Sequence, residues 1–168
     1  MTRKSAAGIR LLILDVDGTL TDGRLYFGPR GEALKVFHVR DGHGIKRLDA
    51  AGVEVAVISG RTSRMVNVRC RDLGVEHVIQ GAEDKVLAFE RLRKRLKIEA
   101  SESACVGDDA PDVPLMKAVK LAFAVADAHP EAIRAAHVVT SLPGGRGAVR
   151  EVCDYLLTAR KRLSKTSR

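Results

Sequence analysis

Residues 9–21, with the sequence IRLLILDVDGTLT, give the strongest indication of the fold. Their apolar run, residues 11–14, is typical of a strand that is buried on both faces of a sheet. This run ends in two acids, Asp15 and Asp17, directly before Gly18. Charged groups are seldom buried unless they are paired or used, and a bound cation would satisfy both carboxylates. A loop-capping role before the glycine is the alternative, but it explains one acid more easily than two. The stretch therefore favours a functional site at the end of a central strand.

Short apolar segments alternate with helical patterns along the rest of the chain. The expected strands are residues 10–14, 53–59, 77–80, 104–107, 121–125 and 137–140, and the expected helices are residues 44–51, 62–73, 83–96, 111–119, 130–135 and 148–163. Such alternation is typical of an α/β protein with a parallel sheet covered by helices on both faces. One segment differs, because residues 24–39 carry two strand-like runs around the turn cluster GPRGE. We expect it to form a projecting β-hairpin.

The 168 residues fit a single domain spanning residues 1–168. The net charge of +8 lies at the two ends of the chain. The residues that carry the excess are Arg3, Lys4, Arg10, Arg160, Lys161, Arg162, Lys165 and Arg168. The remaining chain has equal numbers of acidic and basic residues and few aromatic ones. We therefore expect solvated basic ends, including a tail from about residue 158, and no binding to nucleic acid.

The cysteines and the hydropathy limit the cellular setting. Three cysteines, Cys70, Cys105 and Cys153, are odd in number and widely spaced, so neither a disulfide framework nor a thiolate zinc site is expected. No apolar run reaches about 20 residues, which argues against a membrane-spanning segment. We expect a cytoplasmic protein without membrane partners.

Polar groups follow three of the expected strands. Asp15 and Asp17 end the first, Ser59 ends the second, and Asp108 and Asp109 follow residues 104–107, with Asp112 close behind; Lys85 opens the helix before that last strand. In open parallel sheets, ligands bind beyond the carboxyl ends of the strands. Taken singly, Ser59 and Asp109 could be helix caps and Lys85 a surface lysine. Taken together, acids, a hydroxyl and a cation at one rim predict a catalytic site.

These motifs, in this order, resemble those of the haloacid dehalogenase superfamily of phosphatases. The four segments are DVDGT at residues 15–19, Ser59, Lys85 and GDDAPD at residues 107–112, and they span nearly the whole chain. The resemblance implies a Rossmann-like fold and phosphoryl transfer through an aspartyl phosphate. Asp15 would be the nucleophile and Asp17 the general acid and base. Ser59 and Lys85 would bind the phosphoryl group.

The resemblance also implies a magnesium ion. Asp15, the backbone carbonyl of Asp17 and Asp108 would hold it, with Asp109 or Asp112 supporting these ligands from behind. Such oxygen donors suit a hard cation that retains part of its hydration.

Finer features resemble phosphatases of an eight-carbon sugar-acid phosphate in lipopolysaccharide synthesis. These features are VRDGHGIKRL at residues 39–48, AVADAHP at residues 124–130 and GGRGAVREVCD at residues 144–154. The chain departs from that pattern at His38, where asparagine is expected, and at Ala110-Pro111. The substrate-binding residues implied are Asp17, His38, Val39, Arg40, Asp41, Gly42, Lys46, Arg61, Arg69 and Lys85. Lys46 and Arg69 could equally be solvent-exposed helix residues that do not contact the substrate.

The spacing between the motifs leaves no room for a cap domain, so we expect an open site. By resemblance, a homotetramer with packed hairpins is implied, in which a C-terminal segment reaches a neighbouring site. Gly144, Gly145, Arg146 and Gly147 are candidates for that lid, or for a plain turn. Two other functions stay open: a phosphatase of a nine-carbon sialic-type acid 9-phosphate, and a receiver-like signalling module that keeps its phospho-aspartate.

Overall fold

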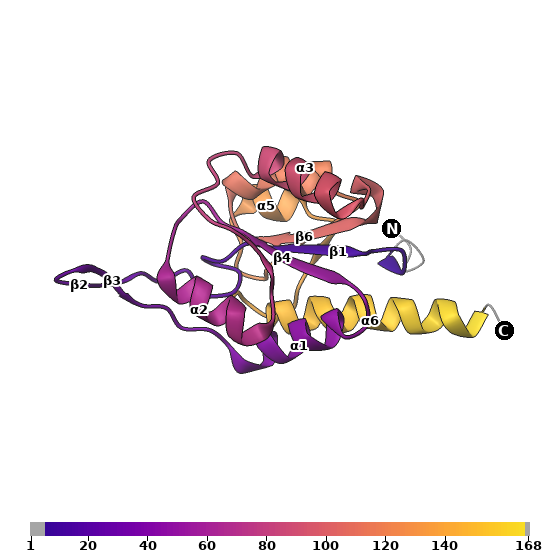
Figure 1. Ribbon diagram of the computed structural model, residues 1–168, viewed down its shortest axis with the longest axis horizontal. Helices are drawn as coiled ribbons and strands as arrows, with labels where there is room; N and C mark the ends of the chain where they lie inside the picture. Colours follow the sequence, from indigo (N-terminus) through magenta and orange to yellow (C-terminus); the bar gives the residue numbers. More distant parts are fainter. Residues whose placement is uncertain (1–5, 167–168) are drawn as a thin grey trace.

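The computed structural model describes residues 6–166 and has a six-stranded parallel sheet at its centre (Figure 1). Along the sheet, the strands are β5 (His77–Ile79), β4 (Glu54–Ile58), β1 (Leu11–Leu14), β6 (Ser103–Gly107), β7 (Leu121–Ala124) and β8 (Val138–Val139). The predicted α/β fold with a Rossmann-like parallel sheet is confirmed.

Strand β1 occupies a central position because all four of its residues are apolar and buried. Leu14 is in register with Val57 of β4 on one side and with Val106 of β6 on the other. Continuing that register places Asp15 beside Gly107, at the end of β6. The carboxyl ends of three adjacent strands therefore meet at one edge of the sheet.

Helices cover both faces of the sheet, as Figure 1 shows. One face carries α3 (Lys85–Leu96), α4 (Val113–Ala118) and α5 (Pro130–Ala135), and the opposite face carries α1 (Val39–Asp49), α2 (Arg64–Leu73) and α6 (Ala148–Thr166). Two short 3-10 helices, η2 (Ala100–Glu102) and η3 (Ala110–Asp112), flank β6. The apolar faces of these helices and both faces of the sheet form one core.

Helix α1 begins five residues before the predicted start at Gly44. The sequence expectation was wrong here because Gly42 and Gly44 weaken a helical pattern. The structure shows why glycine is present. A side-chain carbon at Gly44 would lie 3.2 Å from the backbone of Arg150 and from the Cβ of Cys153 in α6. The two helices pack closely because this position has no side chain.

The predicted hairpin is present, but its strands are shorter than the predicted residues 24–39: they end at Leu34, and Val39 already belongs to α1. Strands β2 (Tyr26–Gly28) and β3 (Gly31–Leu34) pair antiparallel and project away from the sheet (Figure 1). Between β1 and β4 the chain adds only this hairpin and α1, so no cap domain lies in that segment. Several apolar side chains near the hairpin are exposed: Leu25, Tyr26, Phe27, Leu34, Val36 and Val39.

The ends of the chain differ from the expected tails. Helix α6 continues to Thr166, so most of the predicted C-terminal tail is helical. Arg160 donates hydrogen bonds of 3.1 Å to the carbonyls of Ile9 and Ala51, which anchors α6 beneath the start of β1. Arg3, Lys4 and Arg168, which belong to the predicted basic ends, lie outside the described residues.

Two further observations bear on the predicted setting of the protein. Across residues 6–166, no helix is both long and apolar enough to cross a membrane. Cys70, Cys105 and Cys153 are free thiols and all three are buried.

Candidate active site

Lys85 joins two acids at the carboxyl edge of the sheet. Its ammonium group donates hydrogen bonds of 2.6 Å to Asp15 Oδ1 and 2.6 Å to Asp112 Oδ1. The three side chains are at most 9% exposed. Burial alone would lower the pKa of Lys85, but the two carboxylates raise it above its usual value. The lysine therefore stays charged and holds the Asp15 carboxylate in place.

Asp112 is placed for this contact by the turn that follows β6. Its second oxygen accepts hydrogen bonds from the backbone N–H groups of Asp108 (3.0 Å) and Asp109 (3.3 Å). A Cβ at Gly107 would lie 2.5 Å from the Asp112 carboxyl carbon, so the approach requires glycine. Asp109 faces away, is 57% exposed and accepts a hydrogen bond from the N–H of Ala110. The structure thus brings Asp112, and not Asp109, to the lysine.

Asp15, Asp108 and Asp112 form an acidic cluster whose ligand atoms all lie within 4.8 Å of one another. Burial and the neighbouring Asp112 raise the pKa of Asp15 to about 6, although Lys85 opposes this. Burial and the charges of Asp15 and Asp112 likewise raise the pKa of Asp108 to about 8. Lys85 alone does not balance three carboxylates. The cluster is suited to a hard divalent cation, because its three members offer carboxylate oxygens as ligands.

The loop after β1 packs closely against this cluster. Gly18 has a φ of +85°, and a Cβ there would lie 2.0 Å from Asp108 Oδ2. Thr21 fixes the loop from within, because its hydroxyl oxygen accepts hydrogen bonds from the backbone N–H groups of Gly18 (3.4 Å) and Gly23 (3.3 Å). Glycine and threonine in this loop therefore let the backbone approach Asp108.

The GGRG segment lies against the same loop of its own chain. The Gly145 N–H donates to the Thr19 carbonyl at 3.0 Å, and the Gly144 N–H donates to Asp127 Oδ1 at 2.9 Å. A Cβ at Gly144 would overlap the Gly18 carbonyl oxygen at 1.7 Å. The glycines thus pack within the subunit, while the Arg146 side chain is exposed.

Asp17 lies in a different environment from Asp15. Its carboxylate forms an ion pair with Lys35, from the end of the hairpin, and a second one of 3.5 Å with Arg61. Glu32 of β3 also pairs with Lys35, at 3.0 Å. Sequence reasoning placed Arg61 near the substrate but missed Lys35 and Glu32. A lysine between apolar residues of a hairpin resembles any surface charge, so the sequence held no signal for this contact.

Ser59 follows β4 and is buried, at 3% exposure. Its backbone is fixed on both sides: the N–H donates to the Ile79 carbonyl at 2.9 Å, and the carbonyl accepts from Ala82 N–H at 3.0 Å. Its hydroxyl oxygen accepts a hydrogen bond of 3.4 Å from the Arg61 N–H. Since β4 is the neighbour of β1, Ser59 lies at the same edge of the sheet as Asp15.

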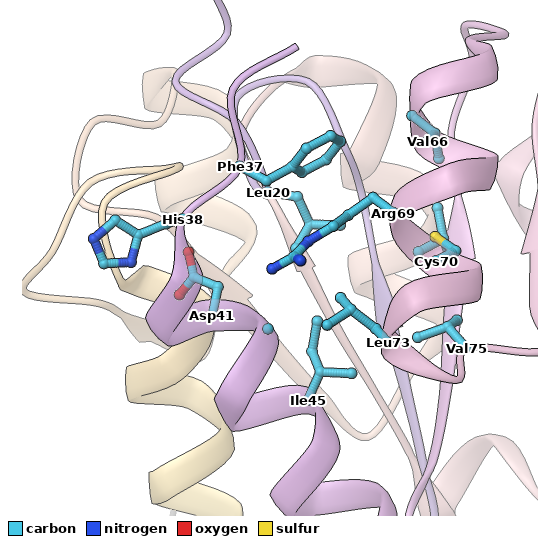
Figure 2. Close-up of a pocket in the computed structure, with 12 residues that line it drawn as sticks. Leu20, Phe37, His38, Asp41, Ile45, Val66, Arg69, Cys70, Leu73 and Val75 are labelled. Atoms are coloured by element: carbon cyan, nitrogen blue, oxygen red, sulfur yellow. The ribbon is translucent and has the colours of Figure 1, made fainter.

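The other residues assigned to substrate gather along α1 and α2. His38, Asp41, Gly42 and Arg69 line a small cavity of about 10 Å³, room for about one water molecule, together with apolar side chains (Figure 2). Figure 2 shows Arg69 reaching from α2 toward α1. Asp41 is buried and accepts a hydrogen bond of 2.7 Å from Arg150 N–H, which ties α1 to α6.

Three residues of the same set, Val39, Arg40 and Lys46, are exposed on α1. No contact of the described residues tests their assignment to the substrate, which stays a prediction.

A parallel sheet has two acids after its central strand, a hydroxyl after the neighbouring strand and a lysine paired with the first acid. This arrangement is typical of a haloacid dehalogenase-like hydrolase. A family model of that description matches residues 77–149. The 3-deoxy-D-manno-octulosonate 8-phosphate phosphatase of Escherichia coli K12 is 52% identical over 160 residues, which cover 95% of this chain and 85% of that protein.

Solved structures agree. The crystal structure of the Yersinia pestis phosphatase of the same name shares 48% identity and a TM-score of 0.93, covering 96% of this chain and 88% of that one. The Moraxella catarrhalis enzyme, solved with a magnesium ion, a phosphate ion and KDO, shares 37% identity and a TM-score of 0.91, covering 99% of this chain and 97% of that one. The chain belongs to the family of 3-deoxy-D-manno-octulosonate 8-phosphate phosphatases.

Proposed function

We propose that this enzyme hydrolyses 3-deoxy-D-manno-octulosonate 8-phosphate to 3-deoxy-D-manno-octulosonate and phosphate, as a step of lipopolysaccharide synthesis. One observation carries the proposal above all. Lys85 holds Asp15 at 2.6 Å within the acidic cluster, while Asp17, two residues further on, is held by other partners. The two acids therefore have separate environments, as nucleophilic attack and proton transfer require.

The Asp15 carboxylate attacks phosphorus and forms an aspartyl phosphate. Asp17, in its protonated form, donates that proton to the departing sugar oxygen, and the resulting carboxylate later accepts a proton from the water that hydrolyses the intermediate. The Ser59 hydroxyl donates a hydrogen bond to the transferring phosphoryl group. Lys85 balances charge on the phosphoryl oxygens and on Asp15.

The acidic cluster supports magnesium as the cofactor, and the Moraxella catarrhalis relative binds this ion. The Asp15 and Asp108 carboxylates and the backbone carbonyl of Asp17 would hold it, and Asp112 would fix the Asp108 backbone behind them. When bound, the ion supplies positive charge to the phosphate oxygens. We assign Asp109, which faces outward, no more than a supporting role in the turn.

For substrate recognition, the proposal assigns the sugar-acid end to His38, Val39, Arg40, Asp41, Gly42, Lys46, Arg61 and Arg69. Arg61 has the most direct support because it lies 3.5 Å from Asp17 and is 46% exposed. Its guanidinium group could bind a carboxylate in a bidentate manner.

We further propose a cytoplasmic homotetramer. The exposed apolar side chains of the hairpin support association, with Phe27 at 67% and Val36 at 54% exposure. Since the glycines of the GGRG segment pack within their own subunit, Arg146 is the residue we assign to a neighbouring site. The free, buried cysteines suit a reducing compartment.

Phosphate release from a panel of phosphorylated sugar acids, with magnesium present, tests the function. We expect the highest kcat/KM with 3-deoxy-D-manno-octulosonate 8-phosphate, no activity for Asp15→Asn, and a loss of about 10²-fold or more in kcat for Asp17→Asn. Preference for a nine-carbon 9-phosphate would replace the proposed substrate. A stable phosphoprotein without turnover would instead support the receiver-like alternative.

A further inference from the structure

Four charged side chains close a ring beside the nucleophile. Lys35 pairs with Asp17 and with Glu32, and Arg61 pairs with the same two acids at 3.5 Å each. The ring joins three distant segments: the loop after β1, the returning side of the hairpin, and the loop after β4. Opposite charges alternate around it, so each side chain has two partners of opposite sign.

Burial distinguishes Lys35 from an ordinary surface lysine. Its side chain is 1% exposed, against 14% for Glu32 and 19% for Asp17. Exposed ion pairs contribute little to stability, but a charge-assisted hydrogen bond that is shielded from water is stronger and more directional. Burial would raise the pKa of Glu32, yet the neighbouring Ser63 hydroxyl and the cations Lys35 and Arg61 lower it below its usual value. Glu32 is therefore a charged partner that fixes Lys35.

The position of Asp17 depends on this ring. Strand β1 ends at Leu14, so Asp17 lies in a turn and no sheet hydrogen bond orients its side chain. Among the described residues, the ion-pair partners of its carboxylate are Lys35 on Oδ1 and Arg61 on Oδ2. Arg61 is 46% exposed and lies further away. Lys35 is thus the stronger constraint on where the carboxylate points.

We propose that Lys35 is a positioning residue for Asp17, and that Glu32 positions Lys35, so that the base of the hairpin is part of the catalytic apparatus of its own subunit. The inference rests on the proposed function, since it requires Asp17 to transfer protons. Misplacement of a proton-transfer group lowers the rate of the chemical step and leaves binding of the ground state nearly unchanged. A residue that binds the substrate would instead change KM.

The test compares Lys35→Met with Arg30→Met in the full-length enzyme with magnesium. Arg30 is exposed at the tip of the same hairpin, so its substitution removes the same charge without touching the ring. For Lys35→Met we expect kcat to fall about tenfold or more, with KM within about threefold. Arg30→Met should stay within about twofold of the wild type. Lys35→Arg, which restores a cation, should recover part of the lost kcat.

A double-mutant cycle with Asp17→Asn distinguishes positioning from a general structural role. If Lys35 acts through Asp17, adding Lys35→Met to Asp17→Asn should change kcat by less than about twofold. Should Lys35→Met not fold, Glu32→Gln carries the same test, with an expected loss of about threefold that also disappears in the Asp17→Asn background.

Additive losses, a wild-type kcat in Lys35→Met, or a change confined to KM would overturn the inference. These outcomes are separate from failure of the proposed function, in which the wild-type enzyme itself would release no phosphate from any member of the panel.

Discussion

Removal of divalent metal should make the stability of this enzyme unusually sensitive to pH. Burial and Asp112 raise the pKa of Asp15 from 3.8 to about 6. A carboxyl group with a raised pKa in the folded state stabilises the protein below its unfolded pKa, and this contribution is lost as pH rises through the folded pKa. The difference between the two values corresponds to about 3 kcal/mol of unfolding free energy. Because the pKa of Asp108 is about 8, the loss of unfolding free energy continues up to about pH 8.

Urea unfolding of the chelated protein between pH 4 and pH 8.5 measures this effect. We expect the free energy of unfolding to fall by about 3 kcal/mol or more across that range. Saturating magnesium should flatten the curve, because the ion favours the ionised carboxylates and binds the folded state. The increase in stability on adding magnesium should therefore be larger at pH 8 than at pH 5.

Asp108→Asn serves as the control. It removes one of the repelling charges but keeps the backbone N–H that donates a hydrogen bond to Asp112. The chelated variant should show a flatter pH profile than the wild type and a weaker response to magnesium. The reasoning fails if chelated wild type is as stable at pH 8 as at pH 5, or if the variant reproduces the wild-type profile.

Two other substitutions probe the site. Gly18→Ala would place a Cβ 2.0 Å from Asp108 Oδ2, so we expect at least a tenfold loss of activity in the phosphate-release assay. Gly52→Ala is the control, because Gly52 has a similar φ of +75° but open space around it. This control should lose about 1 kcal/mol of stability and keep normal activity. Lys85→Met leaves two buried carboxylates facing each other without a cation, so urea unfolding at pH 8 should show a loss of about 3–5 kcal/mol, and unchanged stability would contradict this.

The alternating pattern of the chain was sufficient to predict the parallel sheet. Residues 11–14 read as a strand buried on both faces, and they form β1 at the centre of the sheet. Because parallel strands end at one edge, sequence also indicated that Asp15, Ser59 and Asp108 would meet there. The helix predicted in the region of α1 was too short, because glycine weakens a helical pattern in the sequence. The need for glycine at Gly44 arises only from the packing of α1 against α6.

The separate environments of Asp15 and Asp17 do not follow from strand geometry. Residues two apart in a strand point to the same side, so the spacing alone would direct both acids toward one group. Instead, the chain turns directly after β1. As a result, Asp15 pairs with Lys85, whereas Asp17 pairs with Lys35 and Arg61.

Local pattern thus determined the strands, their buried faces and the edge at which the acids collect, because periodicity and hydrophobic burial act over a few residues. The tertiary structure decided which acid meets which cation. Asp112 rather than Asp109 reaches Lys85, and the hairpin brings Lys35 to an acid 18 positions earlier in the chain. Such pairings depend on how turns direct side chains across long sequence separations, and no periodic pattern records that direction.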